Sequence, residues 1–346
     1  VATLVADGTT DVTFNGGAGS DTVTVTNATI TMTDNHFTNI SNMEKLVLTS
    51  TTGDLSLSVG TAFNVAYADG ATITTGIFAA NKDATINAGL STVDTSITLT
   101  MTSSVLTALE VNVITTGSGA DTITFTGDST TVGVASTSGT IVISSGAGVD
   151  TISVVAGTLL PSTGGQFLTV TAGTGADIIS ATKVNSSTVT AHAIYVVAEG
   201  DSLTTAYDQI SLFDVGTNTL MSDGIDFAST STVGTIGTSI DSGTILTHAV
   251  ATAGIATFDD ASTFASAIVI NSSNLSDAIG YLNANTSNKE VLAFLYDSDS
   301  NGANDATMVY HNGVATDSLV MLVGITAVDA LIATTNVAGA NDLFIT

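Results

Sequence analysis

One short motif recurs at nearly even intervals, and it constrains the fold of this chain more than any other feature. The motif reads Gly-x-Gly-x-Asp followed by strand-forming residues, and its regular copies end at Asp121, Asp150 and Asp177. A worn copy follows at Asp208, so that successive aspartates are 29, 27 and 31 residues apart. An earlier copy, which ends at Asp21, fits the fuller form G-G-x-G-x-D-x-U-x. Repetition at a fixed period predicts coils that stack on one another.

The residue types of this motif suit a hard cation. Glycine lets the backbone turn tightly and direct its carbonyl groups inward, and Ca²⁺ takes about six to eight oxygen ligands. Carbonyls plus one aspartate per coil therefore predict calcium sites. The alternative is a set of plain turns without metal, because glycine and aspartate are ordinary turn residues. The candidate metal positions in the motif are Gly17, Gly19, Asp21, Gly117, Gly119, Asp121, Gly146, Gly148, Asp150, Gly173, Gly175, Asp177 and Asp208.

The period predicts the size of the coil. About 28 residues exceed two nonapeptides, so we expect an enlarged coil with the Gly-Asp corner on one edge and further strands, such as Gly139–Ser144 and Phe167–Thr171, elsewhere. Coils about 4.8 Å apart would align the aspartates along one edge. Like charges in such a column would repel one another without a cation.

The composition of the chain limits the classes of molecule that it can bind. The chain has 346 residues, a net charge of -27, 31 acidic residues and four basic ones, all lysine. This excess of negative charge disfavours nucleic acid and anionic lipid, and it invites cations. The lack of cysteine excludes disulfides and thiolate metal sites. There is no run of eighteen apolar residues, so we expect no membrane span.

The chain divides into three regions by pattern. Residues 1–110 read as solenoid rungs that mostly lack metal, with one motif. Residues 111–215 hold the regular ladder, and residues 216–346 read as a β-rich cap or assembly region with one helix, Ser272–Asn285, capped by Asn274. Because the chain begins with Val1, we expect a processed product or the C-terminal part of a longer protein. The strand-like runs predicted in the first region are Leu46–Leu48, Leu55–Val59, Phe63–Tyr67, Ala71–Thr75, Ala84–Asn87 and Ile97–Thr100.

An acidic loop near the C-terminal end offers a further metal candidate. The loop begins at Asp297 and matches the first nine positions of an EF-hand loop, with Gly302 at the sharp turn. Met308 stands where the bidentate glutamate belongs, and the flanks read as strands, so this is not an EF-hand. It is either a hairpin loop that binds calcium or a solvated acidic turn. Its candidate ligands are Asp297, Asp299, Asn301 and Asp305.

The Gly-Gly-x-Gly-x-Asp corners resemble those of the RTX (repeats-in-toxin) family. The whole chain, poor in lysine and rich in Thr, Ala, Gly and Asp, resembles the C-terminal portion of RTX-type bacterial surface-layer proteins. The last residues, Asp342–Thr346, are similar to the acidic and apolar end of type I secretion signals. The resemblance implies a right-handed parallel β-solenoid, an RTX-like β-roll with enlarged coils, Ca²⁺ as cofactor and folding outside the cell. It also implies a homo-oligomeric lattice or filament at the bacterial cell surface.

Catalysis is not expected within these residues. No His-Glu-x-x-His and no Gly-x-Ser-x-Gly motif occurs, and His36, His192, His248 and His311 are scattered. We therefore expect a structural, calcium-dependent, self-assembling surface protein, with a cell-surface glycan or lipopolysaccharide as a further partner. The alternative is an RTX adhesin or biofilm-matrix module, and a third possibility is the non-catalytic secretion part of an RTX enzyme.

Overall fold

The computed structural model describes residues 2–3, 13–76, 82–100, 111–127, 140–155, 165–182, 191–216, 222–227, 231–237, 239–251, 253–336 and 340–345. These residues pack as two units. The N-terminal unit comprises residues 1–174 and 180–191, and the C-terminal unit comprises residues 175–179 and 192–346. Gly139 and Thr346, which belong to segments named in the sequence analysis, lie outside the described residues. The boundary between the units falls within β16 (Ile178–Thr182) and at the start of β17 (Ala191–Val196).

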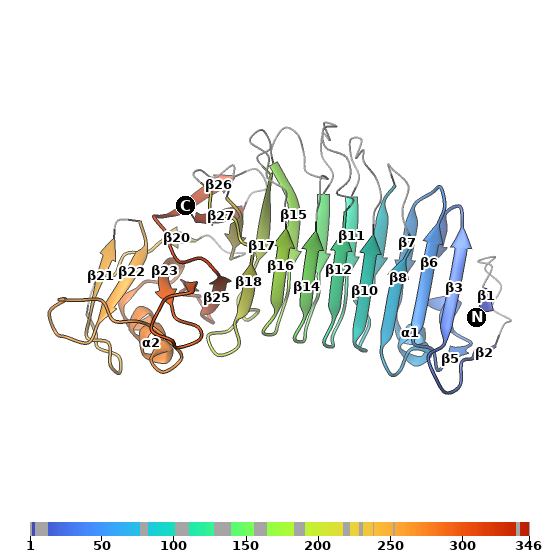
Figure 1. The fold of residues 1–346 in the computed structure, drawn as a ribbon, viewed down its shortest axis with the longest axis horizontal. Coiled ribbons are helices and arrows are strands. Elements are labelled where there is room, and N and C mark those ends of the chain that lie inside the picture. Colours follow the sequence, from blue (N-terminus) through green and yellow to red (C-terminus); the bar gives the residue numbers. More distant parts are fainter. Residues whose placement is uncertain are drawn as a thin grey trace. The chain divides into compact units, whose positions relative to one another are not determined.

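The N-terminal unit is a parallel β-solenoid, as the repeat predicted. Successive long strands along the chain alternate between two parallel sheets, so that each coil contributes one strand to each sheet, and neighbouring strands pair in register (Figure 1). The first sheet has the order β1 (Ala2–Thr3), β3 (Thr22–Asn27), β6 (Lys45–Ser50), β8 (Ala71–Thr75), β10 (Thr95–Thr100), β12 (Thr122–Thr126) and β14 (Thr151–Val155). The second has the order β4 (Ile30–Met32), β7 (Leu55–Ser58), β9 (Ala84–Asn87), β11 (Val111–Thr115), β13 (Thr140–Ser144) and β15 (Gly165–Thr171).

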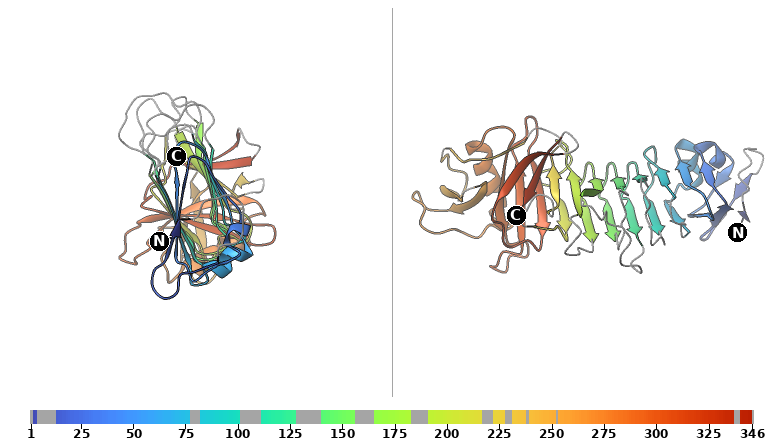
Figure 2. Two further views of the ribbon diagram at one scale, coloured as in Figure 1. Left: turned by 90° about the vertical axis from the view of Figure 1, so that its right-hand side faces the viewer. Right: turned by 90° about the horizontal axis from the view of Figure 1, so that it is seen from above.

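Alternation along each strand builds the core of this unit. Side chains that point inward stack on the same position of the next coil, and strand residues that alternate with them face outward. The view along the stack in Figure 2 shows the blue to green strands overlying one another. One inward row, formed by residues paired in register, is Val23, Leu46, Ile73, Ile97, Ile123 and Ile152, each at most 1% exposed.

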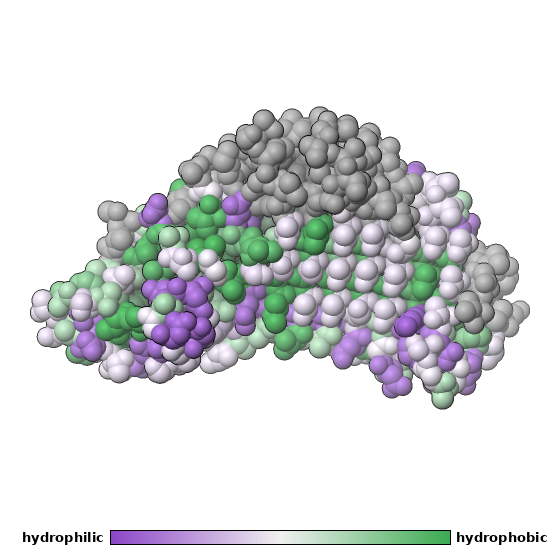
Figure 3. All heavy atoms as spheres, in the orientation of Figure 1, coloured by the Kyte–Doolittle hydropathy of each residue, from purple (hydrophilic) through white to green (hydrophobic). Residues whose placement is uncertain are grey.

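The outward rows of the first sheet are mainly hydroxyl side chains. Thr74, Thr98, Thr124 and Ser153 occupy the same position on four neighbouring strands. Figure 3 shows these strands covered by rows of near-white spheres, which mark residues of intermediate hydropathy. Threonine suits such a position because its branched side chain packs well on a pleated surface while its hydroxyl meets water.

Two short helices and a small ribbon interrupt the N-terminal coils. The segment Phe63–Tyr67 was predicted as a strand, but α1 (Thr61–Ala66) occupies it, because Phe63 and Tyr67 pack with Phe37 in a buried aromatic cluster. The region 29–42 is largely polar and its sequence predicts irregular structure. It nevertheless holds β4, a 3₁₀ helix η1 (Asp34–Phe37) and β5 (Ile40–Ser41), which pairs with β2 (Phe14–Asn15).

The C-terminal unit adds antiparallel strands and one α-helix to the solenoid pattern. Strand β18 (Asp208–Ser211) pairs parallel with β25 (Ser318–Val323), followed in order by β24 (Ala306–His311), β23 (Glu290–Tyr296), β22 (Ile255–Asp259) and β21 (Thr247–Ala251), while β20 (Thr232–Val233) also pairs with β23. A second group has the order β26 (Leu331–Asn336), β27 (Ala340–Ile345), β19 (Gly224–Asp226) and β17.

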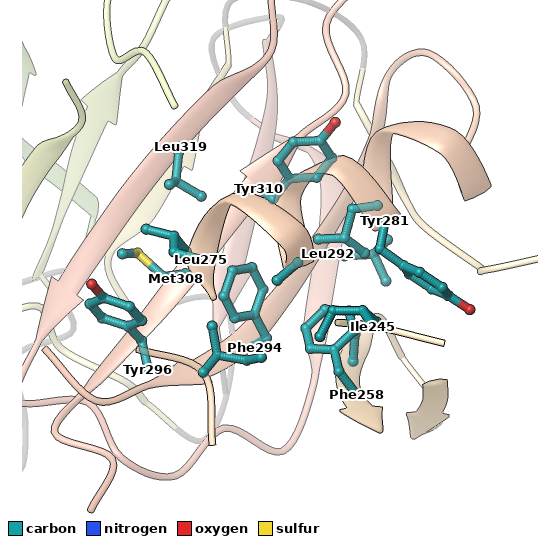
Figure 4. Packing of buried hydrophobic residues seen from close by; sticks show 14 of the residues in the cluster. Ile245, Phe258, Leu275, Tyr281, Leu292, Phe294, Tyr296, Met308, Tyr310 and Leu319 are labelled. Atoms are coloured by element: carbon teal, nitrogen blue, oxygen red, sulfur yellow. The ribbon is translucent and has the colours of Figure 1, made fainter. Parts of the chain in front are cut away.

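The helix α2 (Leu275–Asn285) covers the core of this unit. Its end at Asn285 agrees with the prediction, but it begins at Leu275 rather than at Ser272. Asn274 lies at the predicted cap position, yet it makes no side-chain cap bond to the helix and instead accepts a hydrogen bond from Asn271 N. Tyr281 and Leu282 pack with Phe258, Phe294 and their neighbours in one buried cluster (Figure 4).

Two predictions about the C-terminal turns and strands were wrong. The pair Asn312-Gly313 is typical of a tight two-residue hairpin and predicts one here, but the connection between β24 and β25 runs from 312 to 317. There, the Asp317 carboxylate accepts a hydrogen bond from Gly313 N and so stabilises a longer loop. Val320–Val323 was expected to be the last clear strand, but β26 and β27 follow it.

Candidate functional site: the aspartate corners

The four ladder aspartates all lie at the point where a strand of the solenoid begins. Asp121, Asp150 and Asp177 directly precede β12, β14 and β16, and Asp208 is the first residue of β18. Each is at most 2% exposed. Side chains at this point can reach the backbone N–H groups that the neighbouring strand presents.

In the N-terminal unit, each aspartate caps the strand of the preceding coil. Asp150 Oδ1 accepts a hydrogen bond from Asp121 N at 2.8 Å, and Asp121 Oδ1 accepts one from Thr95 N at 2.7 Å. These residues occupy the same register position, because β10, β12 and β14 pair in register. The motif therefore links one coil to the next through a charge-assisted hydrogen bond.

The C-terminal unit repeats this contact once. Asp208 Oδ1 accepts a hydrogen bond from Asp177 N at 3.0 Å. The next strand in this unit is β25, and a serine takes the place of an aspartate in the cap: Ser202 Oγ accepts a hydrogen bond from Asp208 N at 2.7 Å and donates one to the carbonyl of Leu319. The worn copy at Asp208 thus makes the same contact as the regular copies.

At the early copy of the motif, a glutamate of the next coil replaces an aspartate as the acceptor of this hydrogen bond. Asp21 N donates a hydrogen bond to Glu44 Oε2 at 2.6 Å, and Glu44 directly precedes β6. Asp21 itself is half-buried rather than buried. A glutamate in the next coil can therefore take the position that an aspartate holds elsewhere.

The glycines of the corners are required by close stacking of the backbone. A Cβ atom on Gly146 would lie 2.0 Å from the carbonyl oxygen of Gly117, and one on Gly148 would lie 1.7 Å from that of Gly119. The corner carbonyls take part in the same stacking, since Gly117 O accepts a hydrogen bond from Ala147 N and Gly146 O accepts one from Thr174 N. The glycine pattern thus has a structural cause that does not involve metal.

Burial raises the pKa of the ladder carboxyl groups. Desolvation raises the pKa of Asp121, that of Asp150 to about 6 and that of Asp208 to about 7, and hydrogen bonds to the carboxylates offset only part of the effect. The charges of Asp94 on Asp121, Asp121 on Asp150 and Asp201 on Asp208 act in the same direction as burial. The stack therefore carries buried carboxylates whose charge is disfavoured.

We expect the folded protein to become more stable as the pH falls from 8 to 5. The folded-state pKa values of Asp150 (about 6) and Asp208 (about 7) exceed the ordinary value near 3.9, so their protons stabilise the fold at low pH. This stabilisation is lost as the pH rises through 6 to 7. Thermal unfolding between pH 5 and 8 should show a falling Tm, and Asp208→Asn should flatten the profile. The exposed control Asp69→Asn should leave the slope unchanged; identical slopes in wild type and Asp208→Asn would contradict the assignment.

The corners leave some oxygens available for a cation. Asp21 Oδ2 and Asp121 Oδ2 are buried, and neither has a hydrogen-bond partner among the described residues. A proton, a water molecule or a cation is the usual complement of such an atom. Within the described ranges, however, no three His, Asp or Glu side chains converge as a metal site, so calcium remains a proposal that rests on charge and on these oxygens.

The Asp297 loop joins β23 and β24 as a hairpin, which confirms that its flanks are strands. Asp297 is fully buried and accepts hydrogen bonds from Asn301 N at 3.1 Å and Gly302 N at 2.8 Å. Asp299 accepts from Asn301, and Asp305 accepts from Ser298, which lowers the pKa of Asp305. The loop holds its predicted ligands together through its own hydrogen bonds. This arrangement is compatible with both a calcium site and a solvated acidic turn.

Several capping residues were missed in the sequence. Asp83 Oδ1 accepts a hydrogen bond from Val111 N, Asn112 Oδ1 accepts one from Ala84 N, and Asp223 Oδ1 accepts one from Ala193 N. These side chains cap strands of the second sheet as the ladder aspartates cap the first. The one signal in the sequence was the position of Asp83 directly before the strand Ala84–Asn87, without a glycine motif.

The four histidines make hydrogen bonds or ring contacts with other residues that the structure describes. His36 Nδ1 bonds Thr33, and His248 Nδ1 lies 2.8 Å from the hydroxyl of Tyr281. His311 stacks on Phe227 with ring centroids 4.7 Å apart, and His192 contacts Phe344 edge-on.

Comparisons with protein-family models, with curated proteins and with solved structures find no match to this chain. Among the described residues, none of the helices has the length and apolar character needed to cross a membrane.

Proposed function

We propose that this chain is a structural protein that self-assembles into a bacterial cell-surface array, whether an S-layer, a sheath or a filament. The observation that carries the proposal is the capping of each coil by a carboxylate of the next, seen from Thr95 to Asp121 and from Asp121 to Asp150. These contacts turn the repeat into a continuous backbone stack. Such a stack is suited to a mechanical role, which supports the proposal.

Calcium is the proposed trigger of folding and assembly outside the cell, after type I secretion. The chain carries a net charge of -27 with only four basic residues to offset it. Buried carboxylates with raised pKa values gain stability from any bound counter-charge, and a divalent cation at neutral pH supplies what a proton supplies at low pH. The residues that would hold it are the corner aspartates, with the Asp297 loop as a separate candidate.

The proposal predicts an assembly that depends on calcium. Electron microscopy and sedimentation of the purified chain should show ordered polymers with millimolar calcium, and a chelator should return monomers or unfolded chains. An adhesin would instead stay monomeric and bind a foreign surface. Polymers that persist unchanged in chelator would sink the calcium proposal, and a monomer at every calcium concentration would sink the array.

Substitution of Asp150 can distinguish calcium binding at this corner from a general effect of calcium on a negatively charged chain. Calcium should raise the Tm of the wild type, and Asp150→Asn should reduce this gain, because the amide keeps the acceptor oxygen for Asp121 N but carries no charge. Asp69→Asn removes one exposed charge outside the corners and should keep the full gain. Equal gains in both variants would show that the Asp150 corner binds no calcium.

A further inference from the structure

A cleft opens on the C-terminal unit beside helix α2. Its volume is about 540 Å³, within the range typical of small-molecule sites. One wall is the segment 204–207 before β18, another is α2, and Tyr296 at the end of β23 contributes to the floor. The lining consists of Thr204, Thr205, Tyr207, Ser272, Leu275, Ser276, Ile279, Gly280, Asn283 and Tyr296.

Helix α2 presents a separate face to this cleft. Ser276, Ile279 and Asn283 are spaced by three and four residues, which places them on one side of the helix, and Ser272 lies just before its start. The core uses Ala278, Tyr281 and Leu282 instead. Ser276 and Asn283 are exposed, and Asn283 Nδ2 donates a hydrogen bond to Asp317 Oδ2 beside the cleft.

The floor of the cleft is apolar and its rim carries hydroxyl groups. Leu275 and Tyr296 belong to the buried cluster, labelled in Figure 4, and Tyr207 and Ile279 pack against that cluster. In the part of the chain that the structure describes, no protein group bonds to the hydroxyls of Thr204, Thr205 or Ser276. A hydroxyl can both donate and accept a hydrogen bond. The rim therefore offers several bonds to a ligand.

Charge restricts the class of ligand. The chain contains 31 acidic residues, yet none of them lines the cleft. A cation site would be expected to use a carboxylate, and an anion would be repelled by a net charge of -27. A neutral ligand with hydroxyl groups and an apolar ring face fits both the rim and the floor.

We propose that this cleft binds neutral saccharide units, so that the chain carries its own glycan-binding site. The pyranose ring packs its C–H face on Leu275, Ile279 and the Tyr207 ring, and its hydroxyls bond the serine and threonine hydroxyls on the rim. This inference rests on the proposed function, because a surface array needs an attachment to the cell. The glycan would supply that anchor.

Calorimetric titration of the full chain with maltohexaose, cellohexaose and chitohexaose tests the site. Binding of at least one of these neutral oligosaccharides is expected, and Ser276→Trp should weaken it by about tenfold or more, because the indole fills the cleft from an exposed helix position. Ala284→Trp, also exposed on α2 but outside the lining, should bind as the wild type does. Thr204→Ala with Thr205→Ala should weaken binding without filling the cleft, because both hydroxyls lie on the rim, and circular dichroism should show all variants folded.

The outcomes separate this site from the array. No binding of any of the three sugars at millimolar concentration, or equal binding by Ser276→Trp and wild type, would overturn the saccharide site even if polymers form with calcium. If the wild type binds a saccharide, Ser276→Trp does not, and no polymers form, the saccharide site is supported and the array is overturned.

Discussion

Replacing Gly148 with alanine is expected to cost about 3 kcal/mol or more of the free energy of unfolding, enough to open the corner between two coils. The new Cβ would lie 1.7 Å from the carbonyl oxygen of Gly119 and 2.6 Å from its carbonyl carbon, and both are backbone atoms that cannot rotate away. Gly148 also has φ +141°, a conformation that an alanine rarely adopts. The clash and the strain act together. Chemical denaturation followed by far-UV circular dichroism measures the loss.

Gly17→Ala provides the matched control for this corner. Gly17 belongs to the same motif and has φ +87°, but no atom lies within 4 Å of the position that a Cβ would take there. The substitution therefore adds backbone strain without a clash, and we expect a loss of about 1 kcal/mol. If Gly148→Ala and Gly17→Ala lower the free energy of unfolding by the same amount, close stacking of the coils is not the reason that position 148 requires glycine.

The regular corners show what local pattern can predict. Spacing alone indicated stacked coils, and the structure confirms a parallel solenoid in which Asp121 and Asp150 precede paired strands in register. The pattern could not reveal that Asp150 bonds the backbone of Asp121, because that contact joins residues 29 positions apart. The corner motif consists of neighbouring residues and can be recognised locally. The residue that its aspartate hydrogen-bonds, however, depends on the length of the whole coil.

Tertiary packing explains the local errors. The large side chains of Phe63, Val65 and Tyr67 alternate with smaller residues as in a strand. Phe63 and Tyr67 are also four residues apart, which suits one helical turn, and the edge-on contact of Phe63 with Phe37 at 5.2 Å favours the helix. Asp34 then stabilises that helix by accepting hydrogen bonds from Gly60 N and Phe63 N. A carboxylate 29 residues from the helix it caps leaves no signal in the local sequence.

Long-range contacts limit prediction most in the C-terminal unit. Ser202 donates to the carbonyl of Leu319 across 117 residues of sequence, and that contact accompanies the parallel pairing of β18 with β25. The strand β25 itself was predicted from its apolar run. The pairing of β25 with β18 could not be predicted, because parallel strands are joined by a long connection and no local turn motif marks which strands pair.

Phe294→Ala is expected to be the most damaging core substitution in the C-terminal unit, with a loss of about 3 to 5 kcal/mol in the free energy of unfolding. Phe294 is 1% exposed, pairs with Met308 across β23 and β24, and contacts Phe258 edge-on with centroids 5.5 Å apart. Removal of the ring leaves a cavity beneath helix α2, since Tyr281 packs on Phe258 from that helix.

This prediction has a readout that distinguishes packing from secondary structure. Near-UV circular dichroism should weaken at temperatures where far-UV signal persists, because the aromatic cluster of Phe258, Tyr281 and Phe294 loses its fixed geometry before the strands separate. Val314→Ala, at a position 58% exposed, should change stability by no more than about 0.5 kcal/mol. A loss for Phe294→Ala as small as that of Val314→Ala would mean that the helix is held by its hydrogen bonds to the loops, such as those of Asn285 with Ile240, rather than by the aromatic cluster.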